Sequence, residues 1–287
     1  MIVYIDCRLL SDNPTGISRY TEQLIKFYKS SNICSNLVLI VNSNFDKHNS
    51  NFKYLVTDLN PFSIFDCVKF SLLINRQKLD LLHSPFYSST FFNKNFKKVI
   101  SVMDLMYGII PNYFSTNYLI NFLKVKYFDI IVFLSLRKSS LIISISESTK
   151  SDLSTKFNYI SETIKLGFTD LDSNMIISEE IYKLKNVDYY FYIGNNRKQK
   201  NLDFLIQSFL KSNTNKKLVI AGCVVDKQNN IINFKSVNET ELEFLYKSCF
   251  CFVFPSLYEG FGIPVIEAIS YSCSILLSNA GSLKEFK

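Results

Sequence analysis

Residues 249–268 read CFCFVFPSLYEGFGIPVIEA, and this stretch decides the fold. Its apolar start, Cys249–Phe254, predicts a buried strand. A turn with two glycines follows, and Pro264 then suits the first turn of a helix that extends to Tyr271. In open parallel sheets, ligands bind at the carboxyl ends of the strands, so this turn is the first place where a site is expected.

The same alternation of short apolar runs and helical patterns extends over the whole chain. In the first half, strands are predicted at Ile2–Ile5, Asn36–Val41, Leu81–His83, Lys98–Val102 and Leu141–Ile145, and helices at Gly16–Lys29, Phe62–Arg76, Tyr118–Ser135 and Glu147–Lys156. In the second half, strands are predicted at Tyr189–Ile193, Lys217–Ala221, Ile231–Lys235, Cys249–Phe254 and Ser274–Ser278, and helices at Leu202–Lys211, Glu239–Ser248 and Pro264–Tyr271. We therefore expect two doubly wound α/β domains, residues 1–175 and 186–287, with the boundary in the polar stretch 168–187.

Composition and charge restrict the function classes. Hydrophobic residues make up 47% of the 287 residues and charged residues 20%, which excludes a generally disordered chain. The whole net charge of +7 lies in residues 1–150, because the remaining residues are balanced. A basic half suits an anionic membrane surface, a phosphate-bearing acceptor or nucleic acid, and it is equally compatible with no partner at all. The chain has no recognisable nucleic-acid motif, so we expect no nucleic-acid partner.

Cysteine and histidine usage argues against a structural metal site. The seven cysteines form no Cys-x-x-Cys pair, and only His48 and His83 could add imidazole ligands, so we expect buried, reduced thiols in a cytoplasmic protein. Residues 1–6 have no basic lead-in or long apolar region, and no signal peptide is predicted. The longest apolar stretch, Phe128–Leu136, is too short to span a bilayer and is predicted to be a core helix.

Two loops of the first half lie at predicted strand ends. A glycine at the start of a helix, Gly16, lets backbone amides approach a phosphate, although on these residues alone a plain turn before a helix is the favoured interpretation. Asp104 follows the strand Lys98–Val102, where a carboxylate could bind a hydroxyl or act as a base. The alternative is that Asp104 caps the next segment.

Two loops of the second half carry charge and glycine together. Residues 194–201 place Arg197, Lys198 and Lys200 after a glycine, which suits a diphosphate but also a solvated basic turn. In the stretch 255–267, backbone amides near the glycines could hold phosphate oxygens. Glu267 is then expected to accept hydrogen bonds from ribose hydroxyls, as the acidic residue of dinucleotide folds does, and Glu259 to face the sugar.

The string PSLYEGFGIPVIEA at residues 255–268 resembles the Glu-x7-Glu signature of glycosyltransferase family 4, retaining enzymes with the GT-B fold. Further resemblance lies in residues 6–20, in His83-Ser84-Pro85, in 101–105, in 142–153 and in 192–201. It implies two Rossmann-like domains that face a cleft, the first binding the acceptor and the second the nucleotide-sugar. It also implies catalytic roles for Asp104 and Glu259, and donor binding by Gly16, Arg197, Lys200, Gly260, Phe261, Gly262 and Glu267. Neither a metal nor another cofactor is expected, because Lys and Arg supply the positive charge.

Three departures from the family pattern qualify this expectation. Met103 stands where the family often has a histidine, and Gln199 and Asn195 stand where it often has an arginine. The family usually continues beyond the position of Lys287, so we expect an incomplete second domain with the strand Ser274–Ser278 at an edge.

The expected function is sugar transfer from a nucleotide-sugar to a lipid-linked or other saccharide acceptor in bacterial surface polysaccharide or O-antigen synthesis. This would occur in the cytoplasm, with the basic N-terminal half in peripheral contact with the anionic inner face of the membrane. The alternatives are a truncated, non-catalytic remnant or half of a split glycosyltransferase, and a sugar-nucleotide epimerase or phosphorylase on the same fold.

Overall fold

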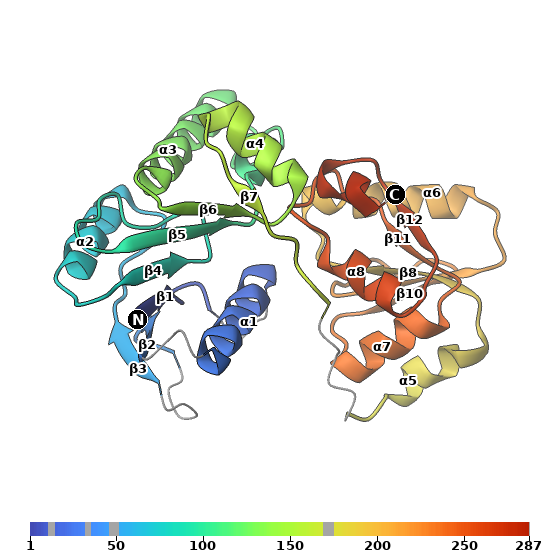
Figure 1. Ribbon diagram of the computed structural model, residues 1–287. Helices are drawn as coiled ribbons and strands as arrows, with labels where there is room; N and C mark the ends of the chain where they lie inside the picture. Colours follow the sequence, from blue (N-terminus) through green and yellow to red (C-terminus); the bar gives the residue numbers. More distant parts are fainter. Residues whose placement is uncertain (11–14, 32–35, 46–51, 169–174, 287) are drawn as a thin grey trace. The chain divides into compact units, whose positions relative to one another are not determined.

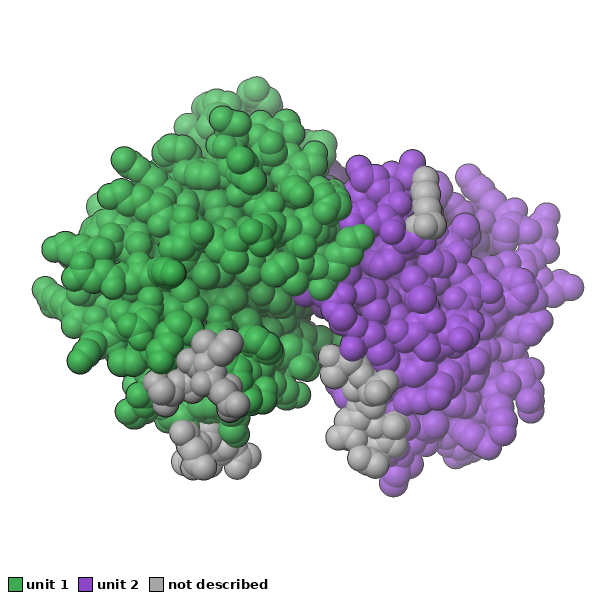
Figure 2. Space-filling view, viewed as in Figure 1, with its two compact units in different colours: residues 1–165 green, residues 166–287 purple. Residues whose placement is uncertain are grey.

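The computed structural model describes residues 1–10, 15–31, 36–45, 52–168 and 175–286 (Figure 1). The chain divides into two compact units, Met1–Lys165 and Leu166–Lys287 (Figure 2). The residues that motivated the predicted boundary, 170–174, lie outside the described part, as do residues 11–14 of the first predicted loop, Cys34 and His48. The segment 176–185, which the prediction left between the domains, contributes Ile181 and Leu184 to the core of the second unit.

The first unit is built on seven parallel strands in the order β3-β2-β1-β4-β5-β6-β7. Their bounds are β1 Ile2–Asp6, β2 Asn36–Val41, β3 Lys53–Val56, β4 Leu81–Ser84, β5 Lys97–Val102, β6 Leu141–Ser144 and β7 Glu162–Thr163. The order reverses between β1 and β4, which is the switch point of a doubly wound sheet. Strands β3 and β7 were missed by the prediction, because β3 is short and half-exposed and β7 contains two polar residues.

Helices cover both faces of this sheet. They are α1 Gly16–Ser30, α2 Ile64–Asn75, α3 Tyr118–Leu136 and α4 Glu147–Phe157, with a short turn η1 at Met106–Gly108. Alternate residues of β1 separate the two sides: Val3 and Ile5 belong to the cluster that α1 covers, whereas Tyr4 packs with Phe70 of α2. Helix α1 thus covers one face and α2, α3 and α4 the other (Figure 1).

The second unit is built on five parallel strands in the order β10-β9-β8-β11-β12 around one hydrophobic core. The strands are β8 Tyr189–Ile193, β9 Lys217–Ala221, β10 Ile231–Phe234, β11 Cys251–Phe254 and β12 Ile275–Leu277. The helices are α5 Glu179–Tyr182, α6 Leu202–Lys211, α7 Glu239–Ser248 and α8 Ile263–Ser270, with short turns η2 Lys183–Asn186, η3 Lys198–Lys200 and η4 Gly281–Phe286. The order reverses between β8 and β11, and β12 lies at the edge of the sheet, where Leu276 is exposed.

Side chains cap the starts of helices α4 and α7. Ser146 accepts from the backbone of Thr149 at the start of α4, and Asn238 and Glu241 form a reciprocal capping box at the start of α7. The end of α7 accounts for one shifted boundary: Cys249, predicted to begin a strand, instead closes the helix by donating its N–H to the carbonyl of Leu245. Strand β11 therefore begins at Cys251.

Two expectations about buried residues need correction. The stretch 128–136 is helical but is not a core helix, because Ile130 and Phe133 of α3 are exposed while Ile131 and Val132 are buried. Of the described cysteines, only Cys7 and Cys67 are buried, and the others are half-buried. In the described part of the chain, no helix has both the length and the apolar character that a membrane crossing needs.

Candidate functional site

The candidate site lies at the switch point of the five-stranded sheet. Strands β8 and β11 are parallel neighbours, so the loops at residues 194–201 and 255–262 leave the same edge. Two hydrogen bonds join these loops: the N–H of Leu257 donates to the carbonyl of Gln199 at 2.7 Å, and the side-chain amide of Asn201 donates to the carbonyl of Pro255 at 3.3 Å. The basic loop (residues 194–201) and the glycine-rich loop (residues 255–262) are therefore joined to one another.

An ion pair stands between the two loops. Lys200 Nζ lies 2.7 Å from Glu259 Oε1, and the two side chains are 17% and 12% exposed. The ammonium group also lies 4.8 Å from the ring centroid of Phe254, at the end of β11. Because both partners are largely removed from water, this pair is less screened than a surface pair. Two predicted site residues, far apart in sequence, are thus brought together.

The backbone around Glu259 is held from the following turn, η4. Ser282 Oγ donates to the carbonyl of Glu259 at 3.0 Å and to that of Phe261 at 2.6 Å. Gly281 has φ +52°, and a Cβ there would lie 2.8 Å from the Glu259 carbonyl oxygen, so a side chain would displace this loop. Neither Gly281 nor Ser282 was predicted as part of the site, because they lie outside the signature string.

In the predicted donor-binding residues 260–262, the groups available to a ligand are those of the backbone, not the side chains. Gly262 precedes α8 with φ +108°, and Pro264 lies in the first turn of that helix. Phe261 is 5% exposed and packs edge-on against Phe286. Its ring therefore supports the loop from inside, and what residues 260–262 can present to a ligand is the polypeptide backbone near a helix N-terminus.

Glu267 projects from α8 and is buried, with 4% exposure. The hydroxyl of Tyr246, on α7, donates to Glu267 Oε2 at 2.9 Å. Tyr246 itself is fully buried and packs its ring against Phe191 and Tyr271. The carboxylate is therefore fixed by a rigid aromatic partner, and the role of Glu267 at a ribose stays a prediction.

The basic loop begins with a turn that the sequence did not reveal. The buried hydroxyl of Tyr192 donates to the carbonyl of Asn195 at 3.2 Å, and the side chain of Asn195 accepts from the N–H of Arg197 at 3.3 Å. Burial, with smaller contributions from Cys223 and Glu259, raises the pKa of Tyr192. Tyr192 is thus a neutral donor at physiological pH, and Arg197 lies exposed before η3.

Asp104 and Gly16 belong to the first unit. The carboxylate of Asp104 accepts from the N–H of Met106 at 3.0 Å, and Leu105 is the residue that precedes the turn η1. Gly16 is exposed at the start of α1, where Thr15 Oγ1 accepts from the N–H of Ser18 at 3.2 Å. Their roles in catalysis and donor binding stay predictions.

Side-chain hydrogen bonds join β4, β5 and α1 in the first unit. His83 Nε2 lies 2.8 Å from Ser101 Oγ, which lies 2.8 Å from the hydroxyl of Tyr20 on α1. His83 Nδ1 lies 3.3 Å from the hydroxyl of Tyr28, also on α1. Burial lowers the pKa of His83 to about 4, so the imidazole is neutral at pH 7.

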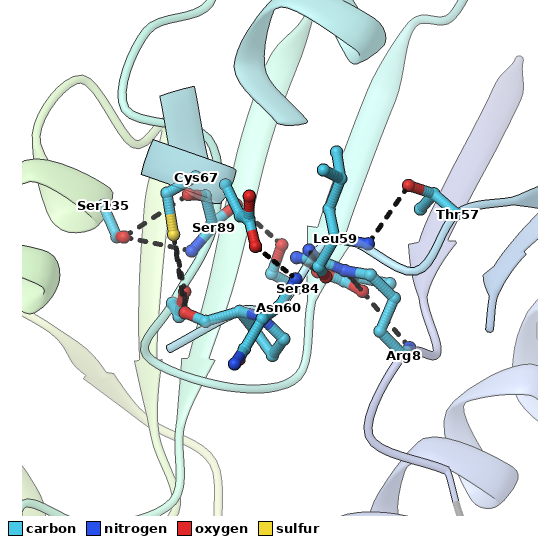
Figure 3. A network of polar contacts seen from close by, with 12 residues as sticks. Arg8, Thr57, Leu59, Asn60, Cys67, Ser84, Ser89 and Ser135 are labelled. Carbon is cyan, nitrogen blue, oxygen red and sulfur yellow. Dashed lines mark hydrogen bonds and ion pairs between the residues drawn. The ribbon is translucent and has the colours of Figure 1, made fainter. Parts of the chain in front are cut away.

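A small pocket in the first unit is lined by Asp6, Leu9, Ile17, Pro61, Pro85, Phe86 and Ser88. Figure 3 shows a network of polar contacts in the same unit that includes Arg8, Leu59, Cys67, Ser89 and Ser135. The guanidinium of Arg8 makes a two-pronged contact with Asp6 at 2.8 and 2.7 Å, donates to the carbonyl of Leu59 and lies 3.7 Å from the ring centroid of Phe70. In the part of the chain that the structure describes, no group of three His, Cys, Asp or Glu side chains could hold a metal ion.

Comparisons with known proteins relate residues 176–286 and the fold to glycosyl transferases. Residues 176–286 match the family described as "Glycosyl transferases group 1". The chain is 27% identical over 187 residues to the O-antigen chain mannosyltransferase B of Escherichia coli, a match that covers 56% of this chain and 49% of that protein. The chain thus spans about half the length of the first curated relatives it matches.

Two solved structures are similar over nearly the whole chain. Sucrose-phosphate synthase from Thermosynechococcus elongatus has a TM-score of 0.72 at 13% identity, covering 99% of this chain and 83% of its own. Anabaena HepE, solved in complex with UDP and glucose, has a TM-score of 0.69 at 14% identity, covering 100% of this chain and 83% of its own. The chain therefore has the GT-B fold, and its residues 176–286 match the group 1 glycosyl transferase family.

Proposed function

We propose that this chain binds a nucleotide-sugar in its second unit and transfers the sugar, with retention of configuration, to a lipid-linked oligosaccharide in bacterial surface polysaccharide or O-antigen synthesis. The observation that carries the proposal is the Lys200–Glu259 ion pair, which joins two loops at the switch point of a group 1 glycosyl transferase domain. Ligands of doubly wound sheets bind at this position.

The chemistry of the pair suits a diphosphate leaving group. Lys200 supplies a compact cation that Glu259 and the ring of Phe254 hold in place, and Arg197 in the same loop can add forked donors. Transfer breaks the bond between the sugar and the diphosphate and forms a bond to an acceptor hydroxyl oxygen. The hydroxyl proton passes to the departing phosphate, whose developing charge Lys200 stabilises without a metal.

Separate observations support the donor and the acceptor. Among the structural neighbours, HepE was solved with UDP and glucose, which supports a nucleotide-sugar donor bound in the second unit near Glu267. The E. coli relative is named for O-antigen chain synthesis, which supports a saccharide acceptor. We assign acceptor binding to the first unit, with Asp104 as the polar group for the acceptor hydroxyl.

The donor part of the proposal is tested by calorimetric titration of nucleoside diphosphates into the wild type and Lys200→Ala. Removing a charge-assisted contact should weaken binding about tenfold to hundredfold. Lys216→Ala is a matched control, because Lys216 also pairs with a carboxylate, Asp188 at 2.8 Å, and lies over a ring, Phe250. It lies at the amino ends of the strands and should leave affinity unchanged.

The catalytic part is tested by a transfer assay with a panel of nucleotide-sugars and a lipid-linked acceptor. The expected result is turnover that Lys200→Ala reduces and Lys216→Ala preserves. Tight nucleotide binding without transfer would favour the non-catalytic remnant or the split enzyme. Absence of any nucleotide binding, or equal losses in both lysine variants, would contradict the proposed site.

A further inference from the structure

Helices α2 and α3 of the first unit expose large apolar side chains on their outer faces. The most prominent are Phe65 and Leu72 on α2, at 81% and 48% exposure, and Leu119, Leu123, Ile130 and Phe133 on α3, at 63%, 58%, 49% and 47%. We call these six residues, with the cations between them, the α2–α3 surface. Single exposed apolar residues are ordinary, but a contiguous group marks an interaction site.

The spacing of these residues aligns them in stripes. On α3, residues 119, 123, 126, 130, 133 and 137 are separated by four and three positions in turn, so they share one helix face. On α2, residues 65, 69, 72 and 76 follow the same spacing along the helix and one residue beyond it. The opposite face of α3 packs on the sheet through Ile131, Val132 and Leu136. The outward stripe is therefore a second apolar face.

The two stripes are neighbours. The hydroxyl of Tyr127, on α3, accepts from the N–H of Ile64 at 3.0 Å and donates to the carbonyl of Phe62 at 3.1 Å. Beneath them, Ile131 of α3 and Cys67 of α2 share a buried cluster. Both helices cover the same face of the sheet (Figure 1). The stripes thus lie side by side on one continuous surface.

The charges within this surface are positive. Lys69, Arg76, Lys126 and Arg137 occupy positions in the two stripes, and Lys124 and Lys138 are exposed beside them. The acidic residues of the two helices are Asp66 and Asp129, which lie 3.8 and 4.0 Å from the ammonium groups of Lys69 and Lys126. Asp129 contacts Lys156 at 2.6 Å and the hydroxyl of Tyr107 at 3.0 Å, and Asp66 accepts from the N–H of Asn60 at 3.2 Å.

We propose that the α2–α3 surface docks on the interface of an anionic lipid bilayer, with its apolar side chains among the headgroups and its cations on lipid phosphates. Helices with an apolar face interleaved with Lys and Arg lie in the plane of such interfaces. A second copy of the chain is a poorer occupant, because the cations of both copies would meet within the contact. The inference rests on the proposed function in one respect: a lipid-linked acceptor gives the surface its purpose.

Vesicle flotation tests the proposal on the full chain. Wild type should float with phosphatidylcholine vesicles that contain about 30 mol% phosphatidylglycerol, bind neutral vesicles more weakly, and be released by about 0.5 M salt. Leu123→Gln/Ile130→Gln should reduce partitioning at least about tenfold. The control Ile160→Gln/Leu276→Gln changes two exposed apolar residues elsewhere and should bind like wild type.

A fluorescent probe locates the contact, because the chain contains no tryptophan. Emission of Phe133→Trp should shift to the blue on anionic vesicles and be quenched by brominated lipid. Phe250→Trp, an exposed aromatic position in the second unit, should show neither change. No vesicle binding by wild type, an equal loss in the control pair, or a dimer that Leu123→Gln/Ile130→Gln dissociates without a change in vesicle binding would overturn the proposal.

Nucleotide titration of the same variants separates this inference from the proposed function. Leu123→Gln/Ile130→Gln should keep the wild-type affinity for nucleoside diphosphates, since the changes lie on the first unit. A protein that binds nucleotide but no vesicle overturns the membrane surface alone. A protein that binds vesicles but no nucleotide overturns the proposed donor site alone.

Discussion

The hydrogen bond from Tyr246 to Glu267 places a carboxylate inside the second unit with a fixed orientation. A buried carboxylate is tolerable when a donor accompanies it, and here the donor sits on a ring that neighbouring aromatics hold on two sides. If Glu267 binds ribose, Tyr246 positions the Glu267 carboxylate and does not itself contact the ligand.

Tyr246→Phe tests this positioning role. The change removes one buried hydrogen bond to a charged group, so we expect a loss of about 2 kcal/mol in unfolding free energy and weaker nucleotide binding. Tyr189→Phe is the matched control, because Tyr189 is also fully buried and donates to the carbonyl of Leu245 at 3.0 Å. Denaturant unfolding and calorimetric titration measure both effects. Equal losses of affinity in the two variants would argue against a special role for Tyr246.

The individual site residues differ in how far sequence could identify them. Lys200 was selected because positive charge beside glycine at a strand end suits a phosphate, and Glu259 because it begins the Glu-x7-Glu string and was expected to face the sugar; the structure pairs them. Tyr246 could not be selected, since it continues the apolar face of α7 with Leu242 and Leu245 and therefore resembles core. Ser282 holds the site through backbone carbonyls, and such contacts leave no pattern in the sequence.

Strands β4 and β5 and helix α1 are tied together by the hydrogen bonds of His83. The pKa of His83 is lowered from 6.5 to about 4 by burial, so the unfolded chain takes up this proton at a higher pH than the folded one. The contribution of His83 to the free energy of unfolding is therefore fully present above pH 6.5. It decreases by up to about 3 kcal/mol as the pH falls toward 4.

Denaturant titrations between pH 7 and pH 4 measure this loss. His83→Gln cannot titrate, so its unfolding free energy should fall less steeply over the same interval than that of the wild type. The difference between the two slopes isolates His83 from the carboxylates that titrate in both proteins. Parallel slopes would mean that His83 takes up its proton at the same pH in the folded and unfolded protein, against the lowered pKa.

Most elements were predictable because they have clear local periodicity. Strand Tyr189–Ile193 and helices Leu202–Lys211 and Glu239–Ser248 match the predicted bounds, since each has a clear apolar pattern and Asn238 caps the last helix. Helix α3 shows the limit of this reasoning. It is apolar on both the sheet side and the outer side, and periodicity alone cannot say that the stripe through Leu123 and Ile130 faces outward.

Each of the two units has its own sheet and its own hydrophobic clusters, so a ligand bound within one should stabilise that unit first. The proposed function places the nucleotide in the second unit. At a ligand concentration of about one hundred times Kd, binding contributes about 2.7 kcal/mol to the stability of the bound state.

Hydrogen exchange followed by mass spectrometry should show this as slower exchange in residues 189–201 and 251–270 when a nucleoside diphosphate is added. Peptides from β2 and β3 in the first sheet should exchange as before. In Lys200→Ala at the same nucleotide concentration, the protection should be largely lost. Protection concentrated in β2 and β3 instead would place the nucleotide in the wrong unit.

The doubly wound architecture of the whole molecule was the most predictable property, because two series of strand and helix signals separated by a polar stretch admit few other folds. The boundary after Lys165 was harder to predict from the sequence. Elements α5 and η2 are too short to show periodicity, and they join the core of the second unit through two apolar side chains.

The hydrogen bond between Leu257 and Gln199 has a consequence for how such a domain can evolve. This bond links the loops after β8 and β11, so neither can gain or lose a residue between the bond and the ion pair without shifting the ammonium of Lys200 away from the carboxylate of Glu259. Insertions that diversify specificity must therefore enter elsewhere, for instance in the 222–230 connection between β9 and β10. The lengths of the two linked loops are inherited together.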